Sequence, residues 1–117
     1  MKIVLDTNVL SVAISKRSKY HPIYTQLQNG DYDLLITEDI ILEYEEVIGR
    51  DLNPIVAAIV KDALEILPNV QKITKYYYWQ LIINDPDDDK FVDCAIAGRA
   101  DFLVTIDRHF NVLKNVP

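Results

Sequence analysis

Acidic side chains are concentrated in the stretch 84–93, which reads Asn-Asp-Pro-Asp-Asp-Asp-Lys-Phe-Val-Asp. Five of the chain's 18 acidic residues fall within positions 85–93. A charge run of this density is typical of a solvated loop, but an apolar helical pattern follows this one at once. The carboxylates therefore stand at the start of a helix, where one or two of them suffice as caps. The surplus negative charge indicates a bound cation.

Two further aspartates each follow a short apolar run. The run Lys2–Leu5 stops at Asp6, and the run Phe102–Ile106 stops at Asp107. Such runs are the pattern of buried parallel strands. Because ligands bind beyond the carboxyl ends of parallel strands, we expect both aspartates to lie at one rim of a sheet.

A helix expected after Thr37 supplies a glutamate to the same rim. Apolar residues recur at helical spacing over positions 40–48 and form one stripe. Glu43 and Glu45 fall on the two shoulders of that stripe, and spacing alone does not choose between them. Glu46 falls opposite the stripe and should be solvated.

Four separate segments thus direct carboxylates to one place, and their acids are Asp6, Glu43, Asp107, and Asp88 with Asp89. Carboxylates without a surrounding cluster of His or Cys form the ligand set of a hard cation, Mg²⁺ or Mn²⁺. Without a cation they would repel one another. A divalent ion makes a bound water easier to deprotonate and stabilises charge on a phosphoryl oxygen. The rim therefore suits hydrolysis of a phosphodiester.

Each acid also has a simpler interpretation. Asp6 could cap the first helix, Asp107 could be a turn residue, and Glu43 could be a plain surface charge. Asp93 lies one turn after Asp89 on the same side of its helix, which suggests a supporting or weaker metal-binding role.

Strands alternate with helices along the chain, which predicts an α/β domain with a mainly parallel sheet. The expected strands are Lys2–Leu5, Leu34–Ile36, Val70–Thr74 and Phe102–Ile106, with an edge strand in the tail 109–117. The expected helices run through 9–14, 21–28, 38–48, 54–67 and 91–96. In the fourth helix the expected core face is Ile55, Val56, Ile59, Val60, Leu64 and Leu67. No linker or repeat interrupts the pattern, so residues 1–117 should form a single domain.

The composition bounds the surroundings of the protein. Cys94 is the only cysteine, so no internal disulfide forms, and it is expected as a small buried residue. No apolar run is long enough to span a bilayer and no signal peptide is evident, which predicts a cytoplasmic protein. The net charge of −6 argues against a phosphate-rich partner unless bound divalent metal reverses the local field.

Four fragments of the chain resemble the PIN-domain proteins that occur as toxins in bacterial toxin–antitoxin pairs. The fragments are Val4–Leu10, Ile41–Val47, Asp85–Phe91 and Ala100–Asp107, and the resemblance covers nearly the whole length. It implies a Rossmann-like three-layer α/β/α sandwich and a Mg²⁺- or Mn²⁺-dependent endoribonuclease that leaves 5′-phosphate and 3′-hydroxyl ends. It also implies a homodimer and inhibition by a cognate antitoxin protein.

Carried over by position, the resemblance implies specific roles. The catalytic and metal-binding acids would be Asp6, Glu43, Asp88 and Asp107, with Asp89 as a co-ligand and Asn8, Asp93 and Thr105 as supporting residues. Counting back from Asp107 favours Asp89 as the third acid. A variant of the family's motif that reads Asp-Pro-Asp-Asp, as residues 85–88 do, favours Asp88, which we rank first. The basic residues nearest the motifs are Lys16, Arg17, Lys19, Lys90 and Arg108, which could contact phosphates.

Three other classes of protein compete with this interpretation. A phospho-acceptor receiver domain needs an acidic pair after its first strand, whereas Asp6 is followed by Thr7 and Asn8. It also needs a lysine at its last functional strand, where this chain has Thr105 and then Asp107. A phosphatase of the haloacid type would need an aspartate at the position of Asn8. A degenerate PIN-like module that only binds RNA or a protein partner is the remaining alternative.

Overall fold

In the described part of the chain, five strands form one sheet at the centre of the fold. The computed structural model describes residues 1–74, 86–105 and 113–115, with the backbone alone at 86–89 and 113–115. The strands are β1 (Lys2–Leu5), β2 (Asp33–Ile36), β3 (Val70–Lys72), β4 (Phe102–Val104) and β5 (Leu113–Asn115). Their order is β3-β2-β1-β4-β5, and only β5 is antiparallel to its neighbour. The predicted mainly parallel sheet and the edge strand in the tail are both confirmed.

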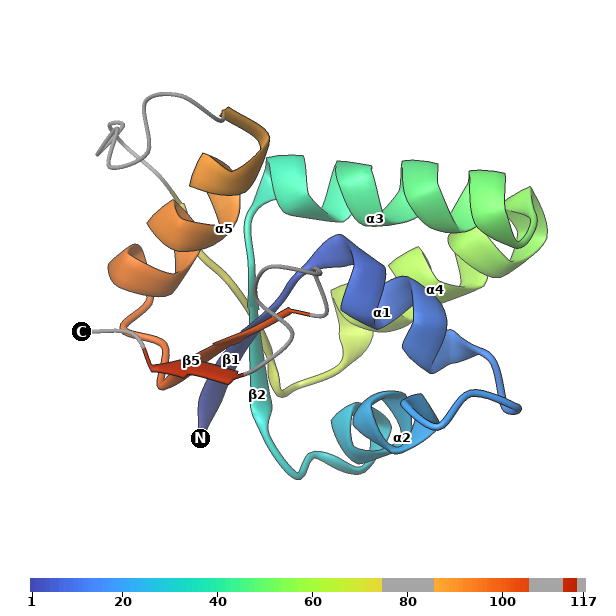
Figure 1. The fold of residues 1–117 in the computed structure, drawn as a ribbon, viewed down its shortest axis with the longest axis horizontal. Helices are drawn as coiled ribbons and strands as arrows, with labels where there is room; N and C mark the ends of the chain where they lie inside the picture. The colour runs from blue at the N-terminus through green and yellow to red at the C-terminus, as the bar shows by residue number, and fades with distance from the viewer. Residues whose placement is uncertain (75–85, 106–112, 116–117) are drawn as a thin grey trace.

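Helices cover both faces of this sheet, as the three-layer prediction requires. They are α1 (Thr7–Ile14), α2 (His21–Asn29), α3 (Glu38–Asp51), α4 (Pro54–Ile66) and α5 (Pro86–Ala97). Parallel crossovers are right-handed. The chain moves from β1 outward to β2 and β3 and then returns to β4 on the other side of β1. The connection through α5 therefore covers the face opposite to α1–α4, and Figure 1 shows α5 across the sheet from α1, α2 and α4.

The helices begin and end at residues whose side chains or conformations the sequence supplies locally. Thr37 accepts a hydrogen bond from the backbone N of Ile40 (3.4 Å), and Asn53 accepts one from Val56 N (2.8 Å). Gly30 ends α2 in the left-handed conformation, with φ 80°. None of the helices in the described ranges has the length and apolar character needed to cross a membrane.

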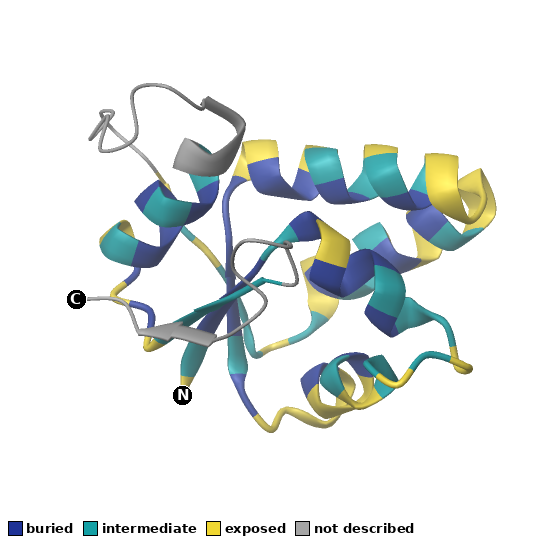
Figure 2. Cartoon of the chain, in the orientation of Figure 1, coloured by how far each residue is buried: buried dark blue, intermediate teal, exposed yellow. Residues whose placement is uncertain are grey.

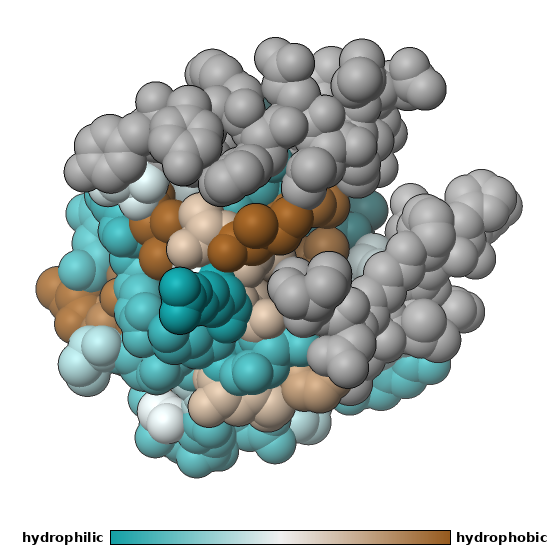
Figure 3. All heavy atoms as spheres, turned by 90° about the vertical axis from the view of Figure 1, so that its left-hand side faces the viewer, coloured by the Kyte–Doolittle hydropathy of each residue, from teal (hydrophilic) through white to brown (hydrophobic). Residues whose placement is uncertain are grey.

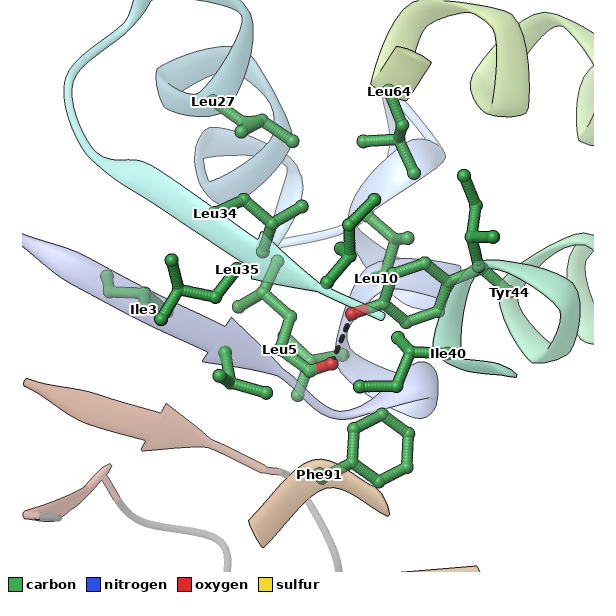
Figure 4. Packing of buried hydrophobic residues seen from close by; sticks show 14 of the residues in the cluster. Ile3, Leu5, Leu10, Leu27, Leu34, Leu35, Ile40, Tyr44, Leu64 and Phe91 are labelled. Carbon is green, nitrogen blue, oxygen red and sulfur yellow. Dashed lines mark hydrogen bonds between the residues drawn. The ribbon is translucent and has the colours of Figure 1, made fainter. Parts of the chain in front are cut away.

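The core is thickest on the face that carries α1–α4. In Figure 2 the buried residues follow β1, β2 and the inward sides of these helices. Figure 4 shows Leu5, Leu10, Ile40 and Tyr44 gathered where β1 ends. On the other face α5 is the only helix among the described residues, and the residues of β4 are only half-buried. Figure 3 views that face and shows hydrophobic surface near its centre.

The predicted core face of α4 is wrong in part. Ile55 and Ile59 are exposed, at 73% and 60%, whereas Val60 and Leu64 are buried as predicted, together with Ala57, which the prediction left out. The apolar residues of α4 itself lie on several of its sides, so their periodicity does not identify the face that packs. Contact with α3 decides it, because the small Ala57 fits against Gly49 of that helix, where a Cβ would lie 3.7 Å from Ala57 Cβ.

The fold predicts opposite effects for two Gly→Ala substitutions. A Cβ at Gly98, directly after α5, would lie 2.6 Å from Leu35 Cδ1 and 3.1 Å from Ile73 Cδ1. Because Leu35 is fully buried, Gly98→Ala should destabilise the protein by about 1–3 kcal/mol through overpacking. Gly49→Ala, inside α3 with ordinary contact distances, should stabilise it by about 0.5–1 kcal/mol. Urea unfolding midpoints measure both, and equal midpoints for the two variants would contradict the packing.

Candidate active site

Asp6 lies where the strand order of the sheet reverses. It directly follows β1, which has β2 on one side and β4 on the other, and such reversal points are where ligands bind in open α/β sheets. The backbone N of Asp6 donates to Val104 O (2.9 Å). Its Oδ2 accepts a hydrogen bond from Thr105 Oγ1 (2.8 Å). Although Asp6 occupies the N-cap position of α1, its side chain makes no capping bond, so capping does not explain the carboxylate.

Glu43 of α3 faces the same strand end. One carboxylate oxygen, Oε2, accepts a hydrogen bond from the Thr7 hydroxyl. The other, Oε1, lies 2.6 Å from Lys90 Nζ of α5. Glu45, the alternative on the other shoulder of α3, is directed instead toward Lys61 of α4 (3.7 Å). The tertiary structure therefore makes the choice that helical spacing left open.

Thr7 links the two acidic segments, and the sequence reasoning did not single it out as a site residue. It is buried, follows Asp6 directly, and bonds to Glu43 across 36 positions of sequence. The only signal in the sequence was a hydroxyl directly after the strand-end aspartate. With Thr105 bonded to Asp6, each of the two described carboxylates is oriented by a threonine from another segment.

Tyr44 joins α3 to the end of β1 through a hydrogen bond in the core. Its hydroxyl donates to Leu5 O (2.5 Å), and the side chain is only 1% exposed (Figure 4). Burial raises the pKa of Tyr44 well above its ordinary value, so the group stays protonated as a donor. Since Leu5 precedes Asp6 and Tyr44 follows Glu43, this hydrogen bond holds the end of β1 against α3 at the site.

The first turn of α5 lies at the same rim, but its acidic side chains are not described. Asp88 and Asp89 fall within this turn, because α5 begins at Pro86. Lys90, the next residue, contacts Glu43, so the start of α5 must be close to α3. Asp107 lies outside the described residues, as does the predicted phosphate contact Arg108.

The remaining predicted residues occupy varied positions. Asn8 is exposed in the first turn of α1, whereas Asp93 is buried in α5. Cys94 is fully buried, as predicted. The basic residues Lys16, Arg17 and Lys19 are exposed beyond the far end of α1, about 12 Å along the helix from Asp6 at 1.5 Å per residue.

The donor chemistry of the site fits a hard divalent cation. Asp6 and Glu43 present carboxylate oxygens, with threonine hydroxyls beside them, and oxygen donors of this type suit Mg²⁺ or Mn²⁺. Glu43 already forms an ion pair with a positively charged group, the ammonium group of Lys90. Among the described side chains no group of three or more His, Cys, Asp or Glu residues is close enough to hold a metal. The side chains of the predicted ligands Asp88, Asp89 and Asp107 are not among those described.

Comparisons with known proteins agree with this fold. The chain is similar in structure to a chain of the VapBC2 complex from Rickettsia felis, which was crystallised bound to a DNA fragment from its promoter. The TM-score is 0.62 at 20% sequence identity, over 93% of this chain and 91% of that chain. This likeness shows a shared fold.

A comparison with curated proteins finds no match. A family model described as PIN domain matches residues 2–109. The match includes β1 to β4, helices α1 to α5, and every residue predicted for the site. Because it covers nearly the whole chain, the protein belongs to the PIN domain family.

Proposed function

We propose that this chain is a metal-dependent endoribonuclease and the toxin of a toxin–antitoxin pair. The observation that carries the proposal is the convergence of Asp6 and Glu43 at the strand-order reversal, linked through Thr7. Membership of the PIN domain family supports a nuclease. Asp88 and Asp89 lie in the first turn of α5, directly before Lys90, which contacts Glu43.

The chain's own residues would prepare the reaction by orienting oxygen ligands. Asp6 and Glu43 would bind the cation, and Thr105 and Thr7 would hold their carboxylates in fixed orientations. The resemblance adds Asp88 and Asp107 as catalytic ligands, Asp89 as a co-ligand, and Asn8 and Asp93 as supporting residues. Bound Mg²⁺ or Mn²⁺ would supply an activated water and neutralise charge on the phosphodiester.

The proposed partners follow the same reasoning. The similar chain comes from a VapBC2 complex, which supports a cognate antitoxin as a protein partner for this chain. The resemblance further suggests a homodimer, and the sequence pattern suggests a single PIN-like domain over residues 1–117 that works in the cytoplasm.

The test is cleavage of single-stranded RNA by the purified chain. With Mg²⁺ or Mn²⁺ we expect products with 5′-phosphate and 3′-hydroxyl ends, and excess EDTA should abolish their formation. Mn²⁺ should also raise the melting temperature, because a ligand that binds only the folded state stabilises it. Cleavage that persists in EDTA, or a folded chain that neither cleaves RNA nor responds to Mn²⁺, would refute the proposal.

The hydrogen bond from Tyr44 predicts a coupled loss of stability and activity. Tyr44→Phe keeps the ring but leaves Leu5 O without this donor in the core, which should cost about 1–3 kcal/mol of unfolding free energy. Tyr32→Phe is the matched control, because the Tyr32 hydroxyl donates to Ile23 O (2.8 Å) at another place in the fold. Urea unfolding should show destabilisation in both variants, but RNA cleavage at a temperature where both are folded should fall only with Tyr44→Phe. Equal activity of the two variants would show that Tyr44 does not position the site.

A further inference from the structure

The ion pair between Lys90 and Glu43 is shorter and less exposed to solvent than the neighbouring ion pair at α3. Lys90 Nζ lies 2.6 Å from Glu43 Oε1, and the two side chains are 13% and 27% exposed. The neighbouring pair, Lys61 of α4 with Glu45 of α3, is looser at 3.7 Å and more exposed, at 33% and 39%. The closer pair is thus better shielded from water, which strengthens its electrostatic attraction.

The contact occupies the acid proposed to bind metal. Thr7 engages Oε2 of Glu43, so the ammonium group of Lys90 is held by the second oxygen of the same carboxylate. A divalent cation bound to Glu43 would lie within a few ångströms of this ammonium group, and at such distances like charges repel strongly when water is partly excluded. Lysine has a flexible four-carbon stem that allows its charge to leave such a position.

We propose that Lys90 holds the place of the metal at Glu43 and competes with the divalent cation for that carboxylate. Without metal the ammonium group neutralises Glu43 and holds its carboxylate in place beside Thr7. Metal binding then has to displace this group, so Lys90 sets the metal concentration at which the site fills. The inference rests on the proposed metal-dependent function and assigns Lys90 a positioning role within it.

The test is a Mn²⁺ titration followed by the melting temperature of the whole chain. Lys90→Met removes the charge and keeps a chain of similar length, so half-maximal stabilisation should need about tenfold less Mn²⁺ than in the wild type. In EDTA the same variant should melt below the wild type. Lys61→Met, which breaks the ion pair with Glu45, is the matched control and should leave the Mn²⁺ midpoint unchanged.

The outcomes separate this inference from the function on which it rests. Stabilisation of wild type and Lys90→Met with the same midpoint, or a higher midpoint in the variant, would overturn the role of Lys90 and leave the metal site standing. The absence of Mn²⁺ stabilisation in either protein would overturn the metal-dependent function itself. If Lys90→Met does not fold, Lys90→Gln serves in its place, and Lys90→Arg, which keeps the charge, should retain a midpoint near that of the wild type.

Discussion

Replacing Asp6 with Asn should reduce metal-dependent RNA cleavage by about 10³-fold or more, because metal ions supply several kcal/mol of transition-state stabilisation. The substitution removes a negative charge from the point where the strand order reverses. It should leave the fold intact, since an amide oxygen still accepts a hydrogen bond from Thr105 and the backbone bond to Val104 O is unchanged. Cleavage of single-stranded RNA at saturating Mn²⁺ measures the loss, and circular dichroism checks the fold.

Asp101→Asn provides the matched control for that experiment. Asp101 accepts a hydrogen bond from Lys2 N (2.8 Å) beside the same two strands, but at their opposite ends. Its substitution removes one negative charge from the chain without touching the proposed site. Similar losses of cleavage for both variants would mean that overall charge, and not the position of Asp6, controls the activity.

Glu43→Gln should lower cleavage by about 10²-fold, whereas Glu45→Gln should leave it close to the wild-type rate. The two glutamates are two positions apart on α3 and have the same chemistry, so only their placement differs. Glu43 bonds to Thr7 and Lys90, whereas Glu45 faces Lys61 on α4. The same RNA assay at several Mn²⁺ concentrations compares the two variants.

The dependence on metal sharpens the comparison of the two glutamates. If Glu43 is a ligand, its amide variant should need more Mn²⁺ for half-maximal thermal stabilisation, because an amide oxygen binds a hard cation more weakly than a carboxylate. Glu45→Gln should keep the wild-type midpoint. A larger effect at Glu45 than at Glu43, in either cleavage or Mn²⁺ dependence, would reject the site as described.

Much of the fold could be predicted because its signals are local. The apolar run before Asp6 and the caps at Thr37 and Asn53 gave strand and helix positions that agree with the structure within a few residues. The prediction was wrong at α4, where Ile55 and Ile59 are exposed. That helix carries apolar residues on several sides, and the short Ala57 at its contact with α3 is a weak signal in the sequence.

The amino-acid sequence alone was enough to predict that Asp6 follows a strand and that Asp88 and Asp89 start a helix, because run length, capping and residue type are properties of neighbouring positions. It thereby determined that Asp6 stands at the carboxyl edge of a mainly parallel sheet. Helical spacing left Glu43 and Glu45 open, and the packing of α3 places Glu43 at this edge, where Thr7 and Tyr44 join α3 to the end of β1 and Lys90 joins it to α5. These contacts join residues far apart in the chain, and they depend on how the helices pack against the sheet.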